Sequence, residues 1–365
     1  MMGHEVDVVC LRRAGEPWRE RQGRVRVYRV PLSHRRGGAV RYLFEYGFFL
    51  LAAASLVTLL HLRRRYDLVQ VNSMPDALVF AALVPRLLGA RVLLDLHECM
   101  PEFFATKFGL PLQHPAVRLV ARVERASICF ADLSCTCTDQ MREAFLSRGA
   151  PPRKLKVVLN SADEQLFDRI RYPPAPRDPG RLVLVCHGSV ERLYGLDTLI
   201  RAVALLKSEL PNLMVKIYGE GTYLQELRVL STELGTDDAI SFSGRFVPME
   251  ELLHAISTAD AGVVAIRRDI FRDLVHCNKM YELISMGKPV ICSRTRSVEK
   301  YFDDACFQFF ASGDEHDLAR AIREFYHQPE LAARMAHRAA EVNEPYRWEH
   351  QRRVYQAIAT SLLEA

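Results

Sequence analysis

The sequence contains no hydrophobic run long enough to cross a bilayer and no N-terminal signal peptide. The apolar core of its first long helical segment, residues 48–60, spans 13 residues and contains Ser55 and Thr58. A membrane-spanning helix needs roughly 18 or more predominantly apolar residues. We therefore expect a cytoplasmic protein in which this segment is either a buried helix or a helix lying in the membrane interface.

Motifs for bound metals and for the common nucleotide-binding loops are also missing. The nine cysteines are scattered, and Cys135 and Cys137 form the only close pair, without a second pair at ligand spacing. We expect reduced thiols, most of them buried. No Asp-x-Asp stands in a metal-binding context, and the chain has neither a dinucleotide fingerprint nor a Walker loop. The expectation is a protein that needs no metal and no cofactor.

Positive charge is concentrated at the start of the chain. The first 70 residues contain thirteen arginines and six acidic residues, an excess of +7, whereas the 365-residue chain has a net charge of +5. The arginine clusters are Arg12, Arg13, Arg35, Arg36, Arg41 and residues 63–65. They could meet an anionic membrane or nucleic acid, although a solvated face is the commoner explanation of any one cluster. Because they flank the apolar segment, we expect a peripheral membrane contact and no nucleic acid.

Strands and helices alternate through the first half of the chain. Strands are predicted at residues 3–10, 25–30, 68–71, 92–96, 133–136 and 157–159, and helices at 41–65, 77–88, 116–130 and 139–148. The alternation is regular from residue 68 onward, and there it predicts a parallel, doubly wound sheet. Ligands of these sheets bind at the carboxyl ends of the strands, which nominates Asn72, His97, Glu98 and Asn160. Each of these residues alone could be a turn or cap residue.

A proline-rich segment separates two similar halves. Residues 167–181 contain four prolines and no periodicity, so we place a linker there. Alternation resumes with strands at 182–187, 214–218, 240–243 and 261–266 and helices at 195–209, 223–234 and 249–258. The predicted architecture is α/β, with two doubly wound Rossmann-like domains at residues 1–166 and 182–343 and a C-terminal helix at 344–365.

Turn residues that include three glycines and one arginine follow the strands of the second half. These residues are Gly188, Ser189, Arg192, Gly219, Gly244 and Val247. Glycine at such a turn lets backbone N–H groups approach a phosphate, and Arg192 would supply positive charge. For Gly188, Ser189 and Arg192, an ordinary strand–helix turn is the alternative. Gly219 and Gly244 could line one shared cleft.

Residues 278–292 join a helix, a charged site and a strand. Asn278 suits an N-cap, Gly287 suits a left-handed helix end, and Pro289 forbids continuation of the helix. Lys279 and Glu282 are three residues apart and share a face near the positive end of this helix. The ammonium suits a diphosphate, and the carboxylate could accept from both hydroxyls of a ribose. An exposed ion pair on a surface helix is the alternative.

Taken together and in order, these segments resemble a retaining glycosyltransferase of family 4, with the two-domain GT-B architecture. The resemblance rests on residues 95–98, 101–102, 160, 187–189, 194–195, 219–221 and 244–248, and above all on 279–290. It implies two Rossmann-like domains facing a cleft. It also implies transfer of a sugar, with retention of anomeric configuration, from a nucleoside diphosphate sugar to an acceptor such as a glycan or a lipid-linked saccharide.

The resemblance further implies roles for individual residues. Glu282 would bind the donor ribose, His97 would face the cleft, and Arg192 and Lys279 would neutralise the diphosphate. The catalytic candidates are therefore His97, Arg192 and Lys279. The donor-binding candidates are Gly188, Ser189, Gly219, Gly244, Val247, Asn278 and Glu282, and the acceptor-side candidates are Asn72, Glu98 and Asn160. The helix at residues 344–365 would pack back on the first domain.

The sequence departs from the family pattern in two places. The family has a glutamate eight positions before Glu282, where this chain has Leu274. The family also has a strand, a glycine loop and a helix ahead of Gly3, so we expect an N-terminal domain that lacks its first strand-loop-helix unit. The alternative function is a degenerate, non-catalytic protein that binds nucleotide sugars, and a sugar phosphorylase or epimerase of the same architecture is a third possibility.

Overall fold

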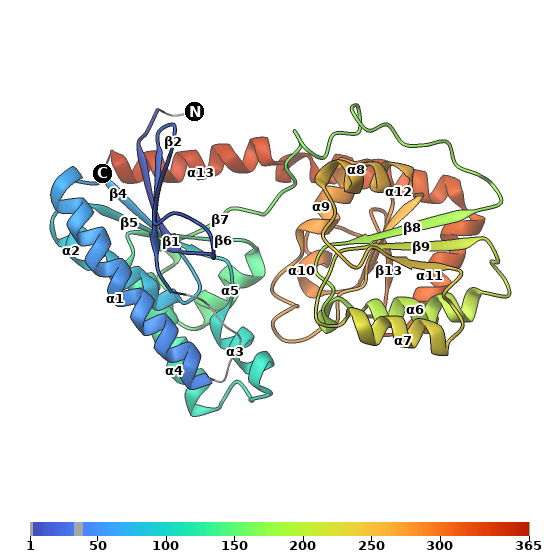
Figure 1. Ribbon diagram of the computed structural model, residues 1–365, viewed down its shortest axis with the longest axis horizontal. Coiled ribbons are helices and arrows are strands. Elements are labelled where there is room, and N and C mark those ends of the chain that lie inside the picture. The colour runs from blue at the N-terminus through green and yellow to red at the C-terminus, as the bar shows by residue number, and fades with distance from the viewer. Residues whose placement is uncertain (1–2, 33–38, 365) are drawn as a thin grey trace. The chain divides into compact units, whose positions relative to one another are not determined.

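The protein folds into two compact units (Figure 1). The computed structural model describes residues 3–32 and 39–364, without the side chains of residues 39–43. The first unit comprises Met1–Cys137, Met141–Val157 and Gln356–Ala365, and the second comprises Thr138–Gln140 and Val158–Tyr355. Of the predicted arginine clusters, Arg35, Arg36 and the side chain of Arg41 lie outside the described residues.

The first unit begins with a small three-stranded sheet. Its strands are β1 (Val6–Leu11), β2 (Arg19–Gln22) and β3 (Val25–Val30), in the order β1-β3-β2. β2 and β3 form an antiparallel hairpin that turns through Gly23 at a φ of +62°, and β1 pairs parallel with β3. The alternation along β3 buries Tyr28 and Val30. β2 was not predicted from the sequence.

A separate parallel sheet forms the centre of the first unit. Its strands, in spatial order, are β4 (Leu68–Asn72), β5 (Arg91–Leu96), β6 (Leu133–Thr136) and β7 (Leu155–Val157). Leu93, Leu94 and Leu96 of β5 are fully buried, as expected for a strand covered on both faces. The parallel sheet predicted from residue 68 onward is confirmed, and β1 and β3 belong to the separate small sheet.

Helices connect these strands. They are α1 (Ala39–Arg64), the 3₁₀-helix η1 (Asp76–Ala82), α2 (Leu83–Leu87), α3 (Met100–Phe108), α4 (Pro115–Phe130), α5 (Asp139–Ser147) and η2 (Pro152–Lys154). The predicted single helix at 77–88 is wrong, because the segment divides into η1 and α2. Pro85 has no N–H to donate to the carbonyl of Ala81, which interrupts an α-helical hydrogen-bond ladder at this point.

α1 is longer and more apolar than its core suggested. The stretch Phe44–Arg64, 21 residues long, meets the length and composition required to cross a membrane, and 22% of its most apolar window is buried. The expectation that the segment is too short is therefore wrong. The helix extends beyond residues 48–60 on both sides, and these extensions are apolar enough to lengthen the hydrophobic stretch. α1 packs along η1 and α2, and it buries Ala53 and Leu60.

The second unit has one six-stranded sheet, and all of its strands are parallel. In spatial order they are β10 (Ile240–Phe242), β9 (Leu213–Tyr218), β8 (Leu182–His187), β11 (Ala261–Val264), β12 (Val290–Ser293) and β13 (Gln308–Phe310). The chain runs from β8 outward to β10 and then crosses to β11 on the other side. Because the strand order reverses between β8 and β11, a crevice is expected at the carboxyl ends of these strands.

Helices cover both faces of this sheet. They are η3 (Arg192–Tyr194), α6 (Leu196–Leu206), α7 (Leu224–Glu233), α8 (Met249–Thr258), α9 (Asn278–Ser285), α10 (Arg296–Glu299), α11 (Glu315–His327) and α12 (Pro329–Asn343). Figure 1 shows α6 and α7 on one side of the sheet and α8 and α9 on the other. β8 is buried along its whole length. The prediction of two α/β units built on parallel strands is confirmed.

The chain ends in the 3₁₀-helix η4 (Glu344–Tyr346) and helix α13 (Trp348–Leu363). The Gln351 side chain anchors the start of α13, because it accepts from the backbone N–H of Leu159 at 2.9 Å and donates to the carbonyl of Pro345 at 3.0 Å. From Gln356 onward, the residues of α13 are grouped with the first unit.

Candidate functional site

A small pocket lies at the carboxyl ends of β8, β9 and β11 in the second unit. Its lining residues are Cys186, His187, Gly188, Ser189, Tyr194, Leu196, Ile217, Tyr218, residues 263–266 and Lys279. The free volume is about 20 Å³, which is enough for one water molecule. Of the predicted donor-side residues, the structure brings Gly188, Ser189 and Lys279 together here.

The Lys279 side chain lines this pocket beside Tyr194 and Gly188. Its Nζ stands 3.5 Å from the centre of the Tyr194 ring, a short cation–π distance. A Cβ atom added to Gly188 would lie 2.5 Å from Lys279 Cε, so the absence of a side chain at Gly188 makes room for the lysine. Burial lowers the pKa of Lys279, and the nearby Cys277, Cys186 and Glu282 act in the opposite direction. A phosphate in this position would replace the lost hydration of the ammonium.

Glu282 makes a short hydrogen bond within the same group of residues. Its Oε2 lies 2.6 Å from Nε2 of His187, the last residue of β8. The His187 side chain is 5% exposed and that of Glu282 is 21% exposed. The sequence interpretation included His187 in the motif but assigned it no role. The partner could not be found from spacing because the two residues are 95 positions apart.

The helix that carries Lys279 and Glu282 begins slightly differently from the prediction. Asn278 is the first residue of α9 and the cap is Cys277, which makes no side-chain hydrogen bond to the helix, so the N-cap assignment is wrong. The predicted end is confirmed: Gly287 has a φ of +67°, and the N–H of Lys288 donates to the carbonyl of Leu283 at 2.9 Å.

The predicted glycines hold neighbouring strand ends close together. Gly219 has a φ of +144°, and a Cβ there would lie 1.8 Å from the carbonyl oxygen of Gly188. The N–H of Gly219 donates at 2.9 Å to the hydroxyl of Ser243. That hydroxyl donates in turn to the carbonyl of Arg245 at 2.8 Å. Ser243, which the sequence interpretation missed, thus joins the turn after β9 to the turn that contains Gly244.

The other predicted donor-side residues do not line the pocket: they are Gly219, Gly244 and Glu282, described above, and Arg192, Asn278 and Val247. Arg192 forms an ion pair with Glu226 and lies over the Tyr223 ring, with its guanidinium carbon 4.5 Å from the ring centre and a side chain that is 68% exposed. Asn278 is exposed and Val247 is partly exposed. An incoming diphosphate would have to compete with Glu226 for Arg192.

A second arginine lies next to the pocket, and the sequence interpretation missed it. Arg267 follows β11, its backbone N–H donates to the carbonyl of Leu193 at 2.9 Å, and its side chain forms an ion pair with Asp197 of α6. A Cβ added to Gly195 would lie 3.6 Å from Arg267 Cγ. The rule that ligands bind at the carboxyl ends of strands could have found Arg267, because it stands three residues after the end of β11.

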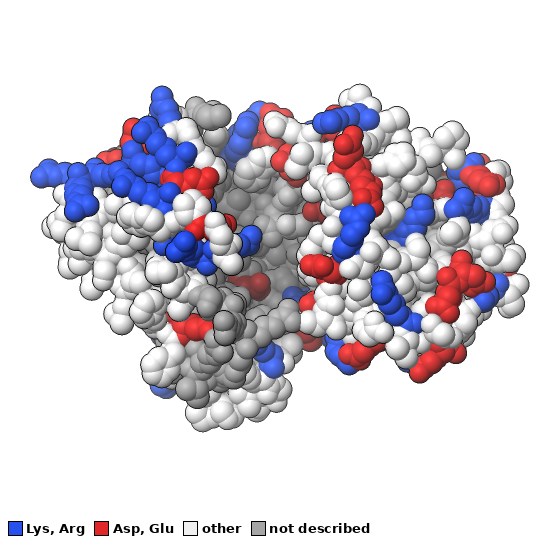
Figure 2. All heavy atoms as spheres, viewed as in Figure 1, with Lys and Arg blue, Asp and Glu red and all other residues white. Residues whose placement is uncertain are grey.

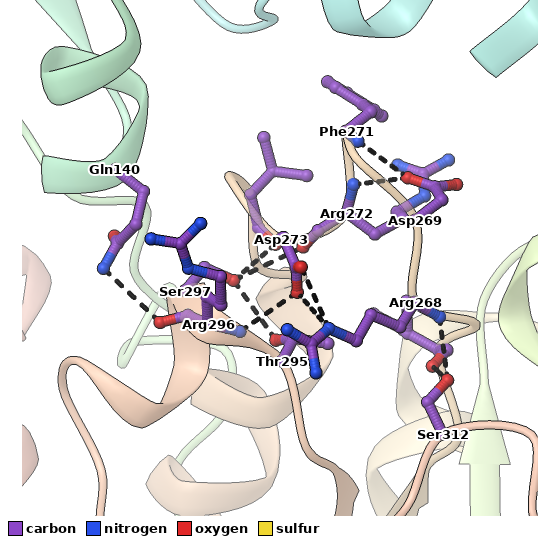
Figure 3. Close-up of polar contacts among 12 residues, drawn as sticks. Gln140, Arg268, Asp269, Phe271, Arg272, Asp273, Thr295, Arg296, Ser297 and Ser312 are labelled. Atoms are coloured by element: carbon purple, nitrogen blue, oxygen red, sulfur yellow. Dashed lines mark hydrogen bonds and ion pairs between the residues drawn. The ribbon is translucent and has the colours of Figure 1, made fainter.

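The loop between β11 and α9 is fixed by two aspartates (Figure 3). Asp269 accepts from the N–H groups of Phe271 and Arg272 at 2.9 and 2.6 Å. Both carboxylate oxygens of Asp273 lie within 2.9 Å of Arg268 Nε, and one of them accepts from the N–H of Arg296 at 3.2 Å. These contacts determine the path of the chain into α9.

Two further contacts hold the end of this loop. The carbonyl of Leu274, the residue at the position of the expected glutamate, accepts from the Thr138 hydroxyl at 2.6 Å. His276 is buried, and its Nε2 lies 3.2 Å from the Tyr281 hydroxyl. Burial lowers the pKa of His276 to about 3, so its imidazole is neutral in the folded protein above that pH.

In the first unit, His97 has the partner that the sequence interpretation could not name. Its Nε2 lies 3.3 Å from Asp95 Oδ2, and its Nδ1 lies 3.7 Å from Cys137 Sγ. The hydrogen bond with Asp95 and then the contact with Cys137 raise the pKa of His97 above its ordinary value. Asp95 could have been found, because residues two apart in a strand point to the same face.

The acceptor-side candidates divide between the two units. Asn72 is opposite Asp95 in the register of β4 and β5, and its Oδ1 accepts from the Gln70 amide at 3.0 Å. The hydroxyl of Ser73, the next residue, accepts from the N–H of His97 at 3.1 Å. Glu98 is the partly exposed neighbour of His97. Asn160 belongs to the residues grouped with the second unit.

Comparison with known families shows two matching domains. Residues 1–161 match the family described as glycosyl transferase 4-like domain, and residues 171–342 match the family described as glycosyl transferases group 1.

Parts of the chain also match curated glycosyltransferases. A GDP-mannose-dependent α-(1-6)-phosphatidylinositol monomannoside mannosyltransferase of Mycolicibacterium smegmatis is 28% identical over 218 residues, covering 56% of each chain. A D-inositol 3-phosphate glycosyltransferase of Streptomyces avermitilis is 27% identical over 299 residues, covering 72% of this chain and 62% of that protein. The chain thus spans less than two thirds of the length of these relatives.

Solved structures resemble the whole chain in fold. The sucrose-phosphate synthase of Thermosynechococcus elongatus has a TM-score of 0.75 and 19% identity, covering 100% of this chain and 90% of that one. Anabaena HepE in complex with UDP-glucose has a TM-score of 0.69 and 16% identity, covering 98% and 100%.

Proposed function

The chain belongs to the family 4 glycosyltransferases of GT-B fold, and from that premise we propose that it transfers a sugar from a nucleoside diphosphate sugar to an acceptor, with retention of anomeric configuration. The observation that carries the proposal is the arrangement at the start of α9. Lys279 and Glu282 stand there beside a glycine turn at the carboxyl ends of parallel strands. This is where the order of strands directs a ligand.

The two side chains suit the two halves of a nucleoside diphosphate. The Lys279 ammonium and the N–H groups at the start of α9 suit the diphosphate. The Glu282 carboxylate suits the ribose hydroxyls, since an ionised carboxylate accepts hydrogen bonds and donates none. The UDP and UDP-glucose bound by Anabaena HepE, a relative in fold, agree in ligand class with this proposal.

The chemical step needs positive charge around the leaving group. As the anomeric carbon becomes oxocarbenium-like, the departing diphosphate gains charge, and preorganised cations lower the barrier. We assign this role to Lys279 and to Arg192, which would have to leave Glu226 when the donor binds. His97, held by Asp95, is the catalytic candidate of the acceptor side. We propose attack of the acceptor on the face that the diphosphate leaves, with the leaving phosphate taking the acceptor proton and no metal taking part.

Nucleotide binding tests this proposal directly. We expect calorimetry of the full chain, with EDTA present, to find micromolar binding of one of UDP, GDP, ADP and dTDP. That nucleotide would identify the class of donor. Binding of none of the four would contradict the proposal.

We further propose that the acceptor is presented at the inner face of an anionic membrane, as a lipid-linked saccharide or a cell-envelope polysaccharide precursor would be. Five apolar side chains on one face of α1 are exposed: Phe44, Phe48, Leu51, Leu59 and Leu62. Their positions follow helical spacing, and Phe44 and Leu51 are 77% and 69% exposed. The exposed Leu83, Leu87 and Leu88 of the neighbouring α2 segment extend the apolar surface.

Basic side chains accompany this surface. Arg63 and Arg65 are exposed at the end of α1 and have no ion pair among the described residues, whereas Arg64 is paired with Asp7 at 2.9 Å. Figure 2 shows further basic side chains gathered over the three-stranded sheet of the same unit. An apolar helix face with arginines at its end is suited to the interface of an anionic bilayer.

Liposome sedimentation tests the membrane proposal. We expect the wild-type chain to sediment with vesicles that contain phosphatidylglycerol at low salt and to bind vesicles of phosphatidylcholine alone more weakly. Leu51→Glu should reduce sedimentation, because it places a charge in the apolar face. Val229→Glu, at an exposed apolar position of α7, is the matched control and should have no effect. Wild-type protein that stays in solution with anionic vesicles would contradict the proposal.

A non-catalytic nucleotide-sugar-binding protein is the second candidate. Leu274, in place of the expected glutamate, removes a possible contact with the donor sugar and favours this candidate. The two functions are separated by incubating the protein with the sugar form of the nucleotide that it binds and with membrane extract as acceptor. An enzyme releases the free nucleoside diphosphate, whereas a binding protein does not.

A further inference from the structure

The hydrogen bond between His187 and Glu282 links β8 to α9 inside the candidate donor site. It joins Nε2 to Oε2 at 2.6 Å. No other hydrogen bond from a described residue reaches the Glu282 carboxylate, so Oε1 has no hydrogen bond within the part of the chain that the structure describes.

The chemistry of the two groups determines the direction of this bond. An ionised carboxylate is only an acceptor, so the hydrogen lies on Nε2 of the imidazole. The bond therefore occupies one carboxylate oxygen and directs the other. A glutamate without such a partner would have to lose the freedom of its side-chain torsions when a ligand binds, which weakens binding.

His187 is itself held firmly. It ends a strand that is buried throughout, it pairs with Tyr218 of β9, and the next N–H, that of Gly188, donates to the carbonyl of Tyr218 at 2.9 Å. Because both the backbone and the ring are buried, the imidazole gives Glu282 a fixed point of attachment.

The pair also keeps Glu282 away from the neighbouring cation. Lys279 stands one helical turn earlier, a spacing at which a glutamate and a lysine ordinarily meet. Within the described chain no ion pair joins them, because the ammonium lies over the Tyr194 ring and the carboxylate is bonded to His187. Both charges consequently remain available for a ligand.

We propose that His187 is a positioning residue for donor binding, which holds one oxygen of Glu282 so that the other accepts from the ribose hydroxyls of a nucleoside diphosphate. This rests on the proposed function, in which Glu282 binds the ribose. His187 touches no reacting atom in this assignment and acts through the glutamate.

Two substitutions at His187 separate positioning from simple structural support. In His187→Gln, the amide Nε2 stands the same number of bonds from Cα as the imidazole Nε2 and can donate the same hydrogen bond. His187→Leu fills similar space without a donor. His254→Leu, at an exposed histidine of α8, is the matched control. Each variant of the full chain is titrated by calorimetry with UDP, GDP, ADP and dTDP, and thermal unfolding is measured alongside.

For the best-binding nucleotide we expect His187→Leu to lose about 10-fold or more in affinity, since hydrogen bonds to charged groups are among the stronger ones. A 10-fold loss corresponds to about 1.4 kcal/mol. His187→Gln and the control should stay within about 3-fold of wild type. The loss in His187→Leu should largely disappear for the 2′,3′-dideoxy form of the same nucleotide, which has no hydroxyls for Glu282.

The outcomes distinguish this inference from the function on which it rests. Glu282→Ala is measured in the same series and should weaken binding by at least as much as His187→Leu. If Glu282→Ala binds normally, or if wild type binds none of the four nucleotides, the proposed function is refuted together with the inference. If Glu282→Ala loses binding while His187→Leu keeps it, or if His187→Leu loses the dideoxy form equally, the inference alone is overturned.

Discussion

Acid should destabilise the second unit through one buried histidine, His276. Its side chain is buried, its Nδ1 has no hydrogen-bond partner among the described residues, and its Nε2 is 3.2 Å from the Tyr281 hydroxyl. Burial lowers the pKa of His276 from 6.5 to about 3. The folded protein therefore keeps this imidazole neutral at pH 5, whereas the unfolded chain binds a proton there.

The sign and size of the effect follow from linkage. Below pH 6.5 the unfolded state binds more protons than the folded state, so the free energy of unfolding falls as the pH falls, until the pH reaches the folded pKa. The fall approaches about 1.4 kcal/mol per pH unit. Between pH 7.5 and pH 5 the contribution of His276 is a loss of about 2 kcal/mol. The figure depends on the unfolded pKa and hardly on the folded value, as long as the folded value lies well below 5.

Chemical denaturation of the wild type and of His276→Gln at pH 7.5 and pH 5 measures this quantity. Glutamine fills part of the same space and can still bond to Tyr281, but it does not titrate. We expect the variant to be less stable than wild type at pH 7.5, and we expect the difference to shrink by about 2 kcal/mol at pH 5. Other titrating groups are common to both proteins and cancel in the comparison. Equal losses of stability in the two proteins would refute the reasoning.

Two further predictions concern the pocket. Gly219→Ala should lower the free energy of unfolding by about 2 kcal/mol or more and weaken nucleotide binding, because its Cβ would meet a backbone oxygen at 1.8 Å. Gly235→Ala is the control: it is also at positive φ, but its Cβ would meet no atom of the described chain within 4 Å beyond its two chain neighbours. It should cost only about 1 kcal/mol in denaturant titrations. Lys279→Met should weaken nucleoside diphosphate binding about 10-fold or more in calorimetry. The same variant should not lower the melting temperature, since it removes a cation whose burial is unfavourable, and a stability loss without an affinity loss would contradict the assignment of Lys279.

The sequence by itself determined the features that depend on near neighbours in the chain. The end of α9 at Gly287 was predicted from the conformational freedom of glycine and the missing N–H of proline, both local properties. The buried run of β8 and the shared helix face of Lys279 and Glu282 follow from the periodicities of strand and helix. The order of strands, helices and motifs was enough to identify the family.

Only the tertiary structure decided which side chains meet. His187 and Glu282, 95 residues apart, are joined because β8 lies in the middle of its sheet and α9 starts beside its end. Arg192 is paired with Glu226, and Lys279 lies over Tyr194. These contacts form because the segments that follow different strands meet at the carboxyl edge of one sheet. The division of the first half into two sheets depends on which strand edges form hydrogen bonds. Such contacts depend on strand order and side-chain packing across the fold, which local sequence patterns do not encode.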